Sequence, residues 1–429
     1  METIVIVGGG AGGLELATRL GQKLGRKKRA KIILVDKNRT HIWKPLLHEV
    51  ATGSLDINTD GVVYRAHSSS HFYQFQLGTM VGLSLAAKTI RLQALSDEQG
   101  REVLPERELA YDTLVMAVGS VSNDFGTPGV AEHSFFLDSH LQAERFHRAL
   151  LNQFMRINQQ SSAAELRLAI VGGGATGVEL AAELNHVADL LKIYGMPDMS
   201  SQRLKIDLIE AGPRILPALP ERIAQAAKRE LNRLGVTIHE HMRVTSADEQ
   251  GFIANDTERV AADLMVWAAG VKAPEFIQQL NLFETNRSGQ ILVKDTLQST
   301  VDDSVYVIGD CCACQQADGS WVPPRAQSAH QMATLVFNNI MRARQDKSQQ
   351  GYIYRDHGSL VNLSRYSTVG SLMGNLTKGS MFVEGRIARL VYISLYRMHQ
   401  VAIHGWLKAG AVMLAQKISS TVKPKMKLH

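Results

Sequence analysis

Cysteine is scarce in this sequence and is confined to one place. The chain has 429 residues and three cysteines, which are Cys311, Cys312 and Cys314. A secreted disulfide framework would distribute its cysteines along the chain, so this pattern favours a reducing compartment. Three cysteines within four positions also lie too close together to complete a tetrahedral zinc site without distant ligands. We therefore predict no metal site and a structural role for the thiols, with metal or redox work as the weaker alternative.

Long apolar runs and an N-terminal leader are absent as well. No uncharged apolar stretch approaches the roughly 18–20 residues that a membrane-spanning helix needs. The first apolar strand begins at residue 2 or 3, with no charged and apolar leader before it, which argues against a cleaved signal peptide. The net charge is only +6. No aromatic and basic recognition motif accompanies it, so we expect no nucleic-acid partner.

The remaining composition is that of a globular protein. Hydrophobic residues make up 45% of the chain and charged residues 21%, which excludes a disordered chain. A chain of this length is expected to form two or three domains.

The N-terminal stretch predicts a nucleotide-binding turn. A β-branched run at residues 4–7 indicates a buried strand, a GxGxxG motif follows, and a helical run covers residues 14–24. The glycines let the backbone approach a ligand, and the N–H groups of the helix start face anionic oxygens, so a dinucleotide diphosphate fits here. The next strand ends in Asp36, whose carboxylate can accept hydrogen bonds from ribose hydroxyls. The three glycines are Gly8, Gly10 and Gly13.

The same pattern occurs a second time, which indicates two nucleotide-binding domains. A strand at residues 168–171 precedes the second GxGxxG motif, and the strand after its helix ends in Glu210. Apolar strands that lead into Gly119 and Gly270 form a further matching pair, and we count both glycines among the cofactor contacts. The glycines of the second motif are Gly172, Gly174 and Gly177.

Charged residues near these turns bear on the ligands. Glu210 should repel a 2′-phosphate and favour NADH over NADPH, although Arg214 could pair with such a phosphate. Glu179 lies on the first turn of the second helix, where it either interacts with the helix dipole or contacts the nicotinamide ribose or ring. Lys44 and His48 lie in a loop that leaves the carboxyl end of a strand, where such folds place ligands. Either residue could be catalytic, but a packed or surface role suits both better. We count Lys44 among the candidates for cofactor binding.

Two further segments carry polar candidates. Asp310 follows a strand and a glycine, a position from which its carboxylate can bind a polyol such as the ribityl chain of a flavin. Gln327 and Gln331 are spaced to share one face of a predicted helix, where two amides can bind a carbonyl-bearing ligand. On spacing alone, an ordinary polar helix face is the stronger interpretation. Residues 139–160 also predict a helix, and residues 72–116, including 72–77, predict strands of a small antiparallel layer.

The C-terminal region differs in character from the rest. Residues 385–408 are rich in apolar and aromatic residues, but arginines and a lysine interrupt them too often for a membrane span. Basic residues beside an apolar face with tyrosine and tryptophan fit a helix that lies in a membrane interface. A helix packed on the domain core is the alternative. The predicted apolar stripe consists of Ile387, Leu390, Val391, Ser394, Leu395, Met398 and Ala402.

Together these motifs resemble flavoproteins with two dinucleotide-binding domains. The resemblance rests on both GxGxxG motifs, the strand before Gly119, the Ile-Gly-Asp310 loop and residues 43–51 (WKPLLHEVA). Residues 326–331 (AQSAHQ) and the C-terminal segment further resemble type II NADH:quinone oxidoreductases, the single-chain, non-proton-pumping NADH dehydrogenases of bacterial respiratory chains. The CxxxxC pair of flavoproteins that reduce disulfides is missing from residues 40–51.

The resemblance implies an α/β fold with two Rossmann-like dinucleotide-binding domains, the second inserted in the first, and a C-terminal membrane-associating region with an amphipathic helix. The expected boundaries are, in order, 1–125 (first part of the FAD domain), 126–165 (connector), 166–285 (NADH domain), 286–345 (second part of the FAD domain) and 346–429 (C-terminal region).

It also implies roles for individual residues. We call the two GxGxxG turns the first cradle (Gly8, Gly10 and Gly13) and the second cradle (Gly172, Gly174 and Gly177). The first cradle with Asp36 matches the site of a tightly bound, non-covalent FAD, and Asp310 matches the loop that contacts the flavin. The second cradle with Glu210 matches the site of NADH as substrate. Glu179 matches a family glutamate near the nicotinamide and the flavin ring, whereas Gln327 and Gln331 match residues at the quinone end of the flavin pocket. These three are the catalytic candidates.

The implied function is respiratory NADH:quinone oxidoreduction without proton pumping, in which a hydride passes from NADH to FAD and two electrons then pass to ubiquinone or menaquinone. The protein is expected to be peripheral on the cytoplasmic face of a bacterial inner membrane, bound to anionic lipids, and a second copy in a homodimer is a candidate partner. A sulfide:quinone reductase and a non-enzymatic NADH-sensing flavoprotein are the alternatives. A sulfide:quinone reductase needs a pair of cysteines that are distant in sequence and meet near the flavin. The three cysteines of this chain are neighbours in sequence.

Overall fold

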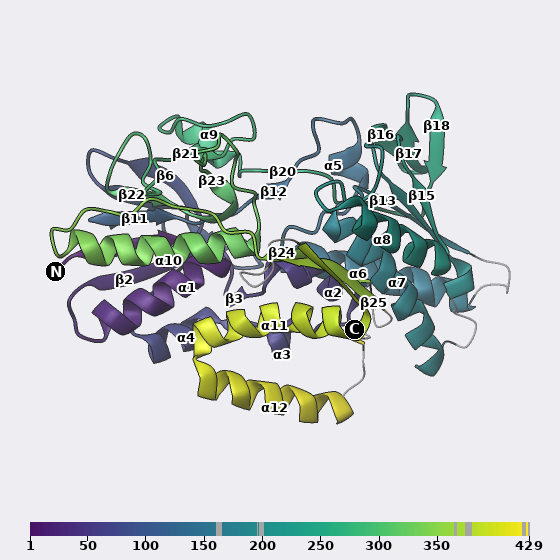
Figure 1. Ribbon diagram of the computed structural model, residues 1–429, viewed down its shortest axis with the longest axis horizontal. Helices are drawn as coiled ribbons and strands as arrows, with labels where there is room; N and C mark the ends of the chain where they lie inside the picture. Colours follow the sequence, from purple (N-terminus) through teal and green to yellow (C-terminus); the bar gives the residue numbers. More distant parts are fainter. Residues whose placement is uncertain are drawn as a thin grey trace. The chain divides into compact units, whose positions relative to one another are not determined.

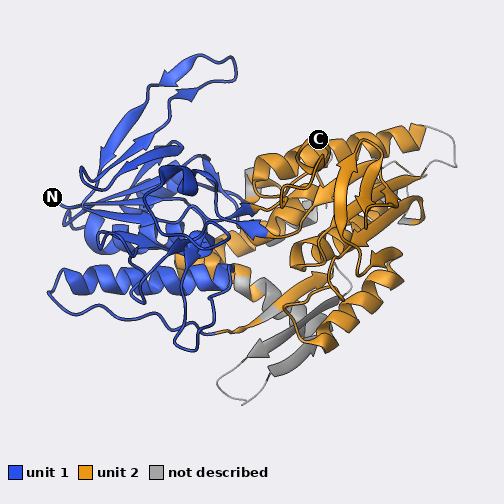
Figure 2. Cartoon of the chain, turned by 90° about the horizontal axis from the view of Figure 1, so that it is seen from above, with its two compact units in different colours: residues 1–43, 61–121, 271–355 blue, residues 44–60, 122–270, 356–429 orange. Residues whose placement is uncertain are grey.

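The structure is a computed structural model that describes residues 1–159, 165–194, 196, 201–363, 367–373, 380–422 and 426–427. Contacts divide it into two compact units, each assembled from three stretches of the chain (Figure 2). Unit 1 contains residues 1–43, 61–121 and 271–355, and unit 2 contains residues 44–60, 122–270 and 356–429. The five-part division expected from the sequence stays a prediction, and the two units are described in turn.

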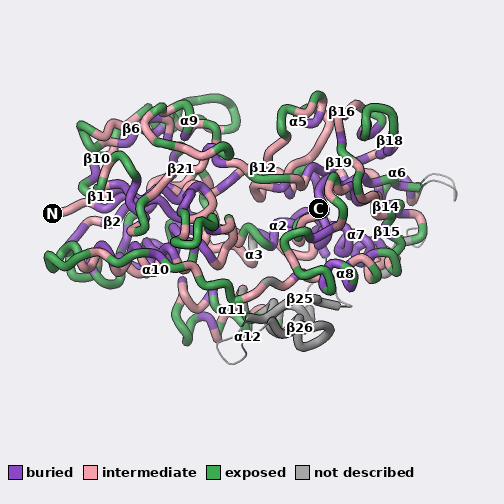
Figure 3. Tube along the Cα trace, turned by 45° about the horizontal axis from the view of Figure 1, so that its top comes forward, coloured by how far each residue is buried: buried purple, intermediate pink, exposed green. Residues whose placement is uncertain are grey.

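Unit 1 is built on a five-stranded parallel sheet with the order β22-β11-β1-β2-β5. Four of its strands are mostly apolar and buried, whereas the edge strand β5 is partly exposed (Figure 3). Helix α1 (Ala11–Leu20) follows β1 directly, and α10 (Ala326–Ala343) packs along α1 (Figure 1). The strands are β1 (Thr3–Val7), β2 (Lys31–Asp36), β5 (Gln74–Leu77), β11 (Thr113–Met116) and β22 (Val305–Val307).

The expectation for residues 72–77 was wrong. These residues form β5, which pairs with β2 in parallel and extends the main sheet. Between the two strands the chain forms α4 (Tyr64–His71), and a crossover of this kind returns a strand in the parallel direction. The antiparallel layer consists instead of β6 (Met80–Ser84), β7 (Thr89–Leu92) and β10 (Arg107–Ala110).

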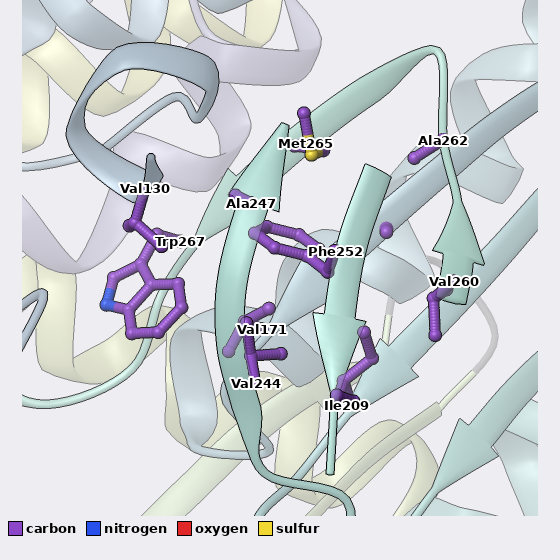
Figure 4. Packing of buried hydrophobic residues seen from close by; sticks show 12 residues of the cluster. Val130, Val171, Ile209, Val244, Ala247, Phe252, Val260, Ala262, Met265 and Trp267 are labelled. Atoms are coloured by element: carbon purple, nitrogen blue, oxygen red, sulfur yellow. The ribbon is translucent and has the colours of Figure 1, made fainter. Parts of the chain in front are cut away.

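Unit 2 repeats the parallel arrangement with the strand order β15-β14-β13-β19. An antiparallel sheet of β16 (Val244–Asp248), β17 (Gly251–Ala254) and β18 (Glu258–Ala261) packs against it, with Phe252 and Trp267 in the shared core (Figure 4). The parallel strands are β13 (Leu166–Val171), β14 (Leu204–Ile209), β15 (Val236–His239) and β19 (Leu264–Trp267), and the helices include α6 (His140–Gln159), α7 (Ala175–Ile193) and α8 (Glu221–Arg233).

The C-terminal region of unit 2 begins with an antiparallel sheet of β24 (Gly358–Leu363), β25 (Ser367–Met373) and β26 (Ser380–Glu384). Two helices follow, α11 (Gly385–His404) and α12 (Trp406–Val422). Gly405 separates them with a φ of +78°, a left-handed conformation that glycine adopts without strain. No helix in the described part of the chain is long and apolar enough to cross a membrane.

The segment at residues 44–60 is separate in sequence from the rest of unit 2. It contains α2 (Leu47–Thr52) and α3 (Ile57–Asp60), and α2 packs against both α6 and α7. Residues 44–60 therefore belong to the core of unit 2, although they follow β2 of unit 1 in the sequence.

Candidate active site

In the first cradle, two backbone segments lie so close together that no side chain fits between them. Gly8 adopts a φ of +108° and donates its N–H to the carbonyl of Val35 at 2.8 Å. A Cβ on Gly13 would collide with the carbonyl oxygen of Gly8. A Cβ on Gly10 would meet no described atom within 4 Å, so this part of the turn faces open space at the start of α1. The arrangement leaves room for an anion directly at the helix N-terminus.

The second cradle reproduces these features. Gly172 adopts a φ of +113°, and its N–H donates to the carbonyl of Ile209 at 2.8 Å. A Cβ on Gly177 would collide with the carbonyl oxygen of Gly172, and Gly174 faces open space among the described residues. The two turns are therefore equivalent in conformation as well as in sequence.

A carboxylate braces each turn from the end of the neighbouring strand. Asp36 accepts hydrogen bonds from the N–H groups of Gly9 and Asn38, both at 2.7 Å. Burial raises the pKa of Asp36 from its ordinary value. In the second unit, Glu210 accepts from Gly173 at 2.8 Å and from Gly212 at 2.6 Å. Each carboxylate thus fixes the glycine loop and remains beside the adenosine end of the expected ligand.

Unit 1 also brings Gly119 and Asp310 to the carboxyl ends of neighbouring strands. Asp310 follows β22 in a 3₁₀ turn and accepts a hydrogen bond from the hydroxyl of Ser120 at 2.8 Å. Gly119 precedes that serine, and its φ is +73°. In unit 2, Gly270 occupies the corresponding place after β19 with a φ of +66°. Lys44 lies in unit 2, at the start of the turn Lys44–Leu46, so the structure does not group it with the first cradle inside one unit.

Glu179 lies in the first turns of α7 and is only 7% exposed. One carboxyl oxygen accepts the N–H of Asn362 from β24 at 3.0 Å, and the other lies 3.7 Å from Nδ1 of His48. The pKa of Glu179 is raised to about 8, mainly by burial and to a smaller extent by the nearby Glu49 and Glu183. The carboxyl group is therefore protonated at neutral pH, which is unusual for a glutamate.

The comparisons with known proteins agree with this geometry. The sequence profile of the family described as "Pyridine nucleotide-disulphide oxidoreductase" matches residues 2–333. A type II NADH:quinone oxidoreductase of Haemophilus influenzae is 46% identical to the chain, and the alignment covers 100% of both proteins.

The chain belongs to the type II NADH:quinone oxidoreductases.

Solved structures agree on the fold. The structure of NDH2 from Plasmodium falciparum in complex with NADH superposes with a TM-score of 0.82 at 19% identity, over 99% of this chain and 100% of that chain. The sulfide:quinone oxidoreductase of Aquifex aeolicus superposes with a TM-score of 0.74 at 16% identity, over 98% of this chain and 95% of that chain. The parallel-sheet dinucleotide-binding domains predicted from the sequence are thus confirmed.

The cysteines do not support the sulfide:quinone reductase alternative, which the family assignment does not favour. All three are buried. Burial raises the pKa of Cys311 to about 12 and that of Cys314 to about 11. The thiols therefore stay protonated at neutral pH, whereas sulfur transfer needs a thiolate nucleophile.

For a type II NADH:quinone oxidoreductase, the quinone-side candidates are Gln327 and Gln331. Both lie on α10 and hold the segment at which the chain leaves unit 1. The amide nitrogen of Gln327 donates to the hydroxyl of Tyr354 at 3.0 Å. Gln331 donates to the carbonyl of Arg355 at 2.8 Å and accepts the N–H of the same residue at 3.0 Å. Their assignment to quinone stays a prediction.

Sequence reasoning missed several partners of the α7 glutamates. Asn362 lies almost two hundred residues beyond Glu179 and reaches it through a backbone N–H, which leaves no trace in residue type. Ser54 donates to Glu183 at 2.5 Å, one helical turn beyond Glu179. The spacing of the two glutamates on α7 was the available signal, since residues four apart share a helix face.

Replacing Glu179 by glutamine should remove a pH-dependent cost of folding. Its pKa is about 8 in the folded chain and its ordinary value is 4.5, so the folded state holds the proton more tightly than the unfolded state does. The stability of the parent protein relative to E179Q should therefore fall as pH rises from about 4.5 to about 8 and then level off, by roughly 2–5 kcal/mol in total.

Denaturant unfolding at about pH 5 and about pH 9 measures this difference. Glu132→Gln is the control, because the Glu132 side chain is 79% exposed. A stability difference between E179Q and the parent that is the same at both pH values would contradict a protonated Glu179.

Proposed function

We propose that this chain oxidises NADH and reduces a membrane quinone in a bacterial respiratory chain without pumping protons, with Glu179 as the group that holds the required proton. Its family membership makes it an FAD-dependent NADH:quinone oxidoreductase. The observation that carries the residue-level proposal is the buried, protonated carboxyl two residues beyond the last glycine of the second cradle.

The first cradle is assigned to FAD and the second to NADH. The first cradle fits a permanent cofactor because Asp36, Gly119 and Asp310 all belong to the same unit and adjoin neighbouring strand ends. Bound there, FAD supplies the hydride acceptor and the electrons for the quinone. The residues of the chain bind and orient the two dinucleotides.

Two charged residues of the second cradle support NADH over NADPH. Glu210 follows β14 beside the second cradle, where a carboxylate would repel the 2′-phosphate of NADPH. Arg214 could have paired with that phosphate, but its guanidinium donates to the backbone carbonyls of the loop that follows. Those carbonyls belong to Leu216, Pro217 and Leu219, at 2.9–3.1 Å.

The stoichiometry of the reaction requires one proton from solvent. NADH delivers one hydride, and a quinol carries two hydrogens more than the quinone, so each turnover takes up one additional proton. A general acid with a pKa near the working pH delivers a proton well. Glu179, with a pKa of about 8, is loaded with that proton at neutral pH.

Gln327 and Gln331 are assigned to the quinone carbonyl in this proposal. The bonds to Tyr354 and Arg355 hold the 354–355 segment against α10. Amide groups of this kind can donate to a quinone carbonyl.

We assign the membrane contact to α12. Leu407, Leu414 and Ile418 lie on one face of this helix and are 92%, 61% and 60% exposed. An apolar helix face of this kind, followed by the basic residues of the chain end, fits the interface of an anionic membrane. Since NADH is a cytosolic substrate, we place this face on the cytoplasmic side. Most side chains of the stripe predicted on α11 lie outside the described residues, apart from Ser394, Met398 and Ala402.

The activity is tested by two half-reactions. We expect anaerobic NADH to bleach the flavin absorbance of the purified holoenzyme, and a short-chain quinone to restore it within the turnover time. Sulfide in place of NADH should leave the flavin oxidised. Flavin that NADH reduces but quinone does not reoxidise would contradict the proposal and favour an NADH sensor.

The assignment of the membrane contact to α12 is tested by placing negative charges on its exposed apolar face. The double substitution Leu414→Glu and Ile418→Glu places two carboxylates on the exposed face, where burial in lipid is costly. We expect the variant to stop sedimenting with vesicles of anionic phospholipid while it still reduces a soluble quinone with NADH. The control carries one glutamate at Val103, an exposed residue of unit 1. Unchanged sedimentation of the α12 variant would place the membrane contact elsewhere.

A further inference from the structure

A buried proton donor needs a path by which it is reloaded. Glu179 gives up its proton once in every turnover under the proposed function, on which this inference rests. Its carboxyl group lies on α7 beneath β24 and α2, and it is almost inaccessible to water. The proton must therefore arrive through a neighbouring side chain, and α2 provides one.

His48 lies between Glu179 and a carboxyl group that water reaches. Its Nδ1 is 3.7 Å from Oε2 of Glu179, and its Nε2 is 3.9 Å from Oε1 of Glu49. The imidazole is 2% exposed, whereas the side chain of Glu49 is 23% exposed. The two ring nitrogens thus lie within 4 Å of two carboxyl groups, one buried and one partly exposed.

We propose that His48 is a positioning residue that relays protons from Glu49 to Glu179 during quinone reduction. Nothing in the family comparison assigns this role, which follows from the placement of α2 against α7.

The protonation state of the His48 imidazole allows it to pass protons on but not to hold an extra one. Burial lowers the pKa of His48 to about 4, so the ring is neutral at neutral pH, with one nitrogen protonated and the other free to accept. A hydrogen bond to the carbonyl of Pro45 holds the ring in place. The distances of 3.7 and 3.9 Å exceed a hydrogen bond, and a small rotation of either glutamate side chain shortens them. Catalytic hydrogen bonds are often long before the substrate binds.

The transfer balances as follows. Glu179 gives its proton to the quinone oxygen. Water at the surface first protonates the Glu49 carboxylate. That proton moves to Nε2 of His48 while the proton on Nδ1 moves to the Glu179 carboxylate. Glu49 thereby returns to its charged state, and the ring then exchanges tautomers. The net result is one proton moved from solvent to Glu179, with no change of charge in the interior.

The surrounding charges favour a protonated Glu179 at rest. Glu49 on α2 and Glu183 on α7 are like charges that raise its pKa, and the N–H of Asn362 on β24 lowers it less than burial raises it. Ser54 donates to Glu183 and so holds that carboxylate on its own side of α7. On the surface side, burial raises the pKa of Tyr396 on α11, and the charges of Asp60 and Glu49 add to that shift.

The neighbouring contacts fix α2 at its other end. Gly53 accepts the backbone N–H of Lys427 at 2.8 Å, and the ammonium group of Lys427 lies 3.5 Å from Glu144 of α6 and 3.9 Å from Asp56. Asp60, the last residue of α3, accepts a hydrogen bond from the side-chain amide of Gln416 on α12 at 2.8 Å. These contacts hold the α2–α3 segment in place, so His48 keeps its position between the two carboxyl groups.

The test compares two acceptors in the holoenzyme. His48→Asn keeps a polar side chain but cannot accept and release a proton at two nitrogens. Ferricyanide takes single electrons without protons, whereas a short-chain quinone needs the relayed proton. We expect H48N to lower the quinone turnover number roughly tenfold, less than the roughly hundredfold or more expected for loss of a general acid itself. The ferricyanide rate should change less than about twofold, and the solvent deuterium isotope effect on quinone turnover should rise.

Glu49→Gln is the second variant, and Glu132→Gln is its matched control, since Glu132 is an exposed glutamate of the same unit. We expect E49Q to lower quinone turnover roughly threefold, with a defect that shrinks as the pH falls and hydronium becomes abundant. E132Q should behave as the parent protein.

Three results would overturn the relay. The first is unchanged quinone turnover in H48N. The second is an equal loss of both activities, which would give His48 a structural role only. The third is quinone turnover in E49Q equal to that in E132Q. If H48N does not fold, His48→Gln decides by the same two rates. A parent protein that reduces ferricyanide but no quinone would instead contradict the proposed function, so the two failures are distinguishable.

Discussion

Both nucleotide-binding turns depend on one close approach, in which the Cα of the third glycine lies against the carbonyl group of the first. Any Cβ at Gly13 or Gly177 would occupy the position of that oxygen. The approach lets the helix begin directly beneath the strand end, and its free N–H groups then face open space. A carboxylate from the next strand, Asp36 or Glu210, holds the loop from the other side. Ligand binding in both units follows from this geometry.

Both units carry a glutamate two places beyond that glycine, but the surroundings of the two glutamates differ. In unit 1, Glu15 on α1 pairs with His330 of α10 at 2.6 Å, and the carboxylate raises the pKa of that histidine. In unit 2, Glu179 meets His48, which burial keeps neutral. Contact with Glu15 therefore raises the pKa of its histidine partner in unit 1, whereas burial lowers the pKa of His48 and raises that of Glu179 in unit 2. Under the proposed function, Glu179 holds the proton that quinone reduction consumes.

The sequence predicted the parts of this structure that depend on local patterns. The two cradles, the carboxylates at the strand ends, the Asp310 loop and the helix at residues 139–160 follow from residue spacing and appear as expected. The parallel direction of β5 could not be predicted from the sequence, because an apolar run does not indicate which strand it will pair with. The pairing of residues 44–60 with α7 could not be foreseen either. It joins segments that are more than a hundred residues apart, and the only local sign was a histidine and glutamates of ordinary type.

The division of labour between the cradles is tested most directly by one substitution in each. The measurement is the flavin content of purified Gly13→Ala and Gly177→Ala proteins, together with flavin reduction when NADH is added. We predict that G13A loses FAD, whereas G177A retains FAD that NADH no longer reduces. Loss of flavin from G177A with full flavin in G13A would contradict the assignment of FAD to the first cradle and NADH to the second.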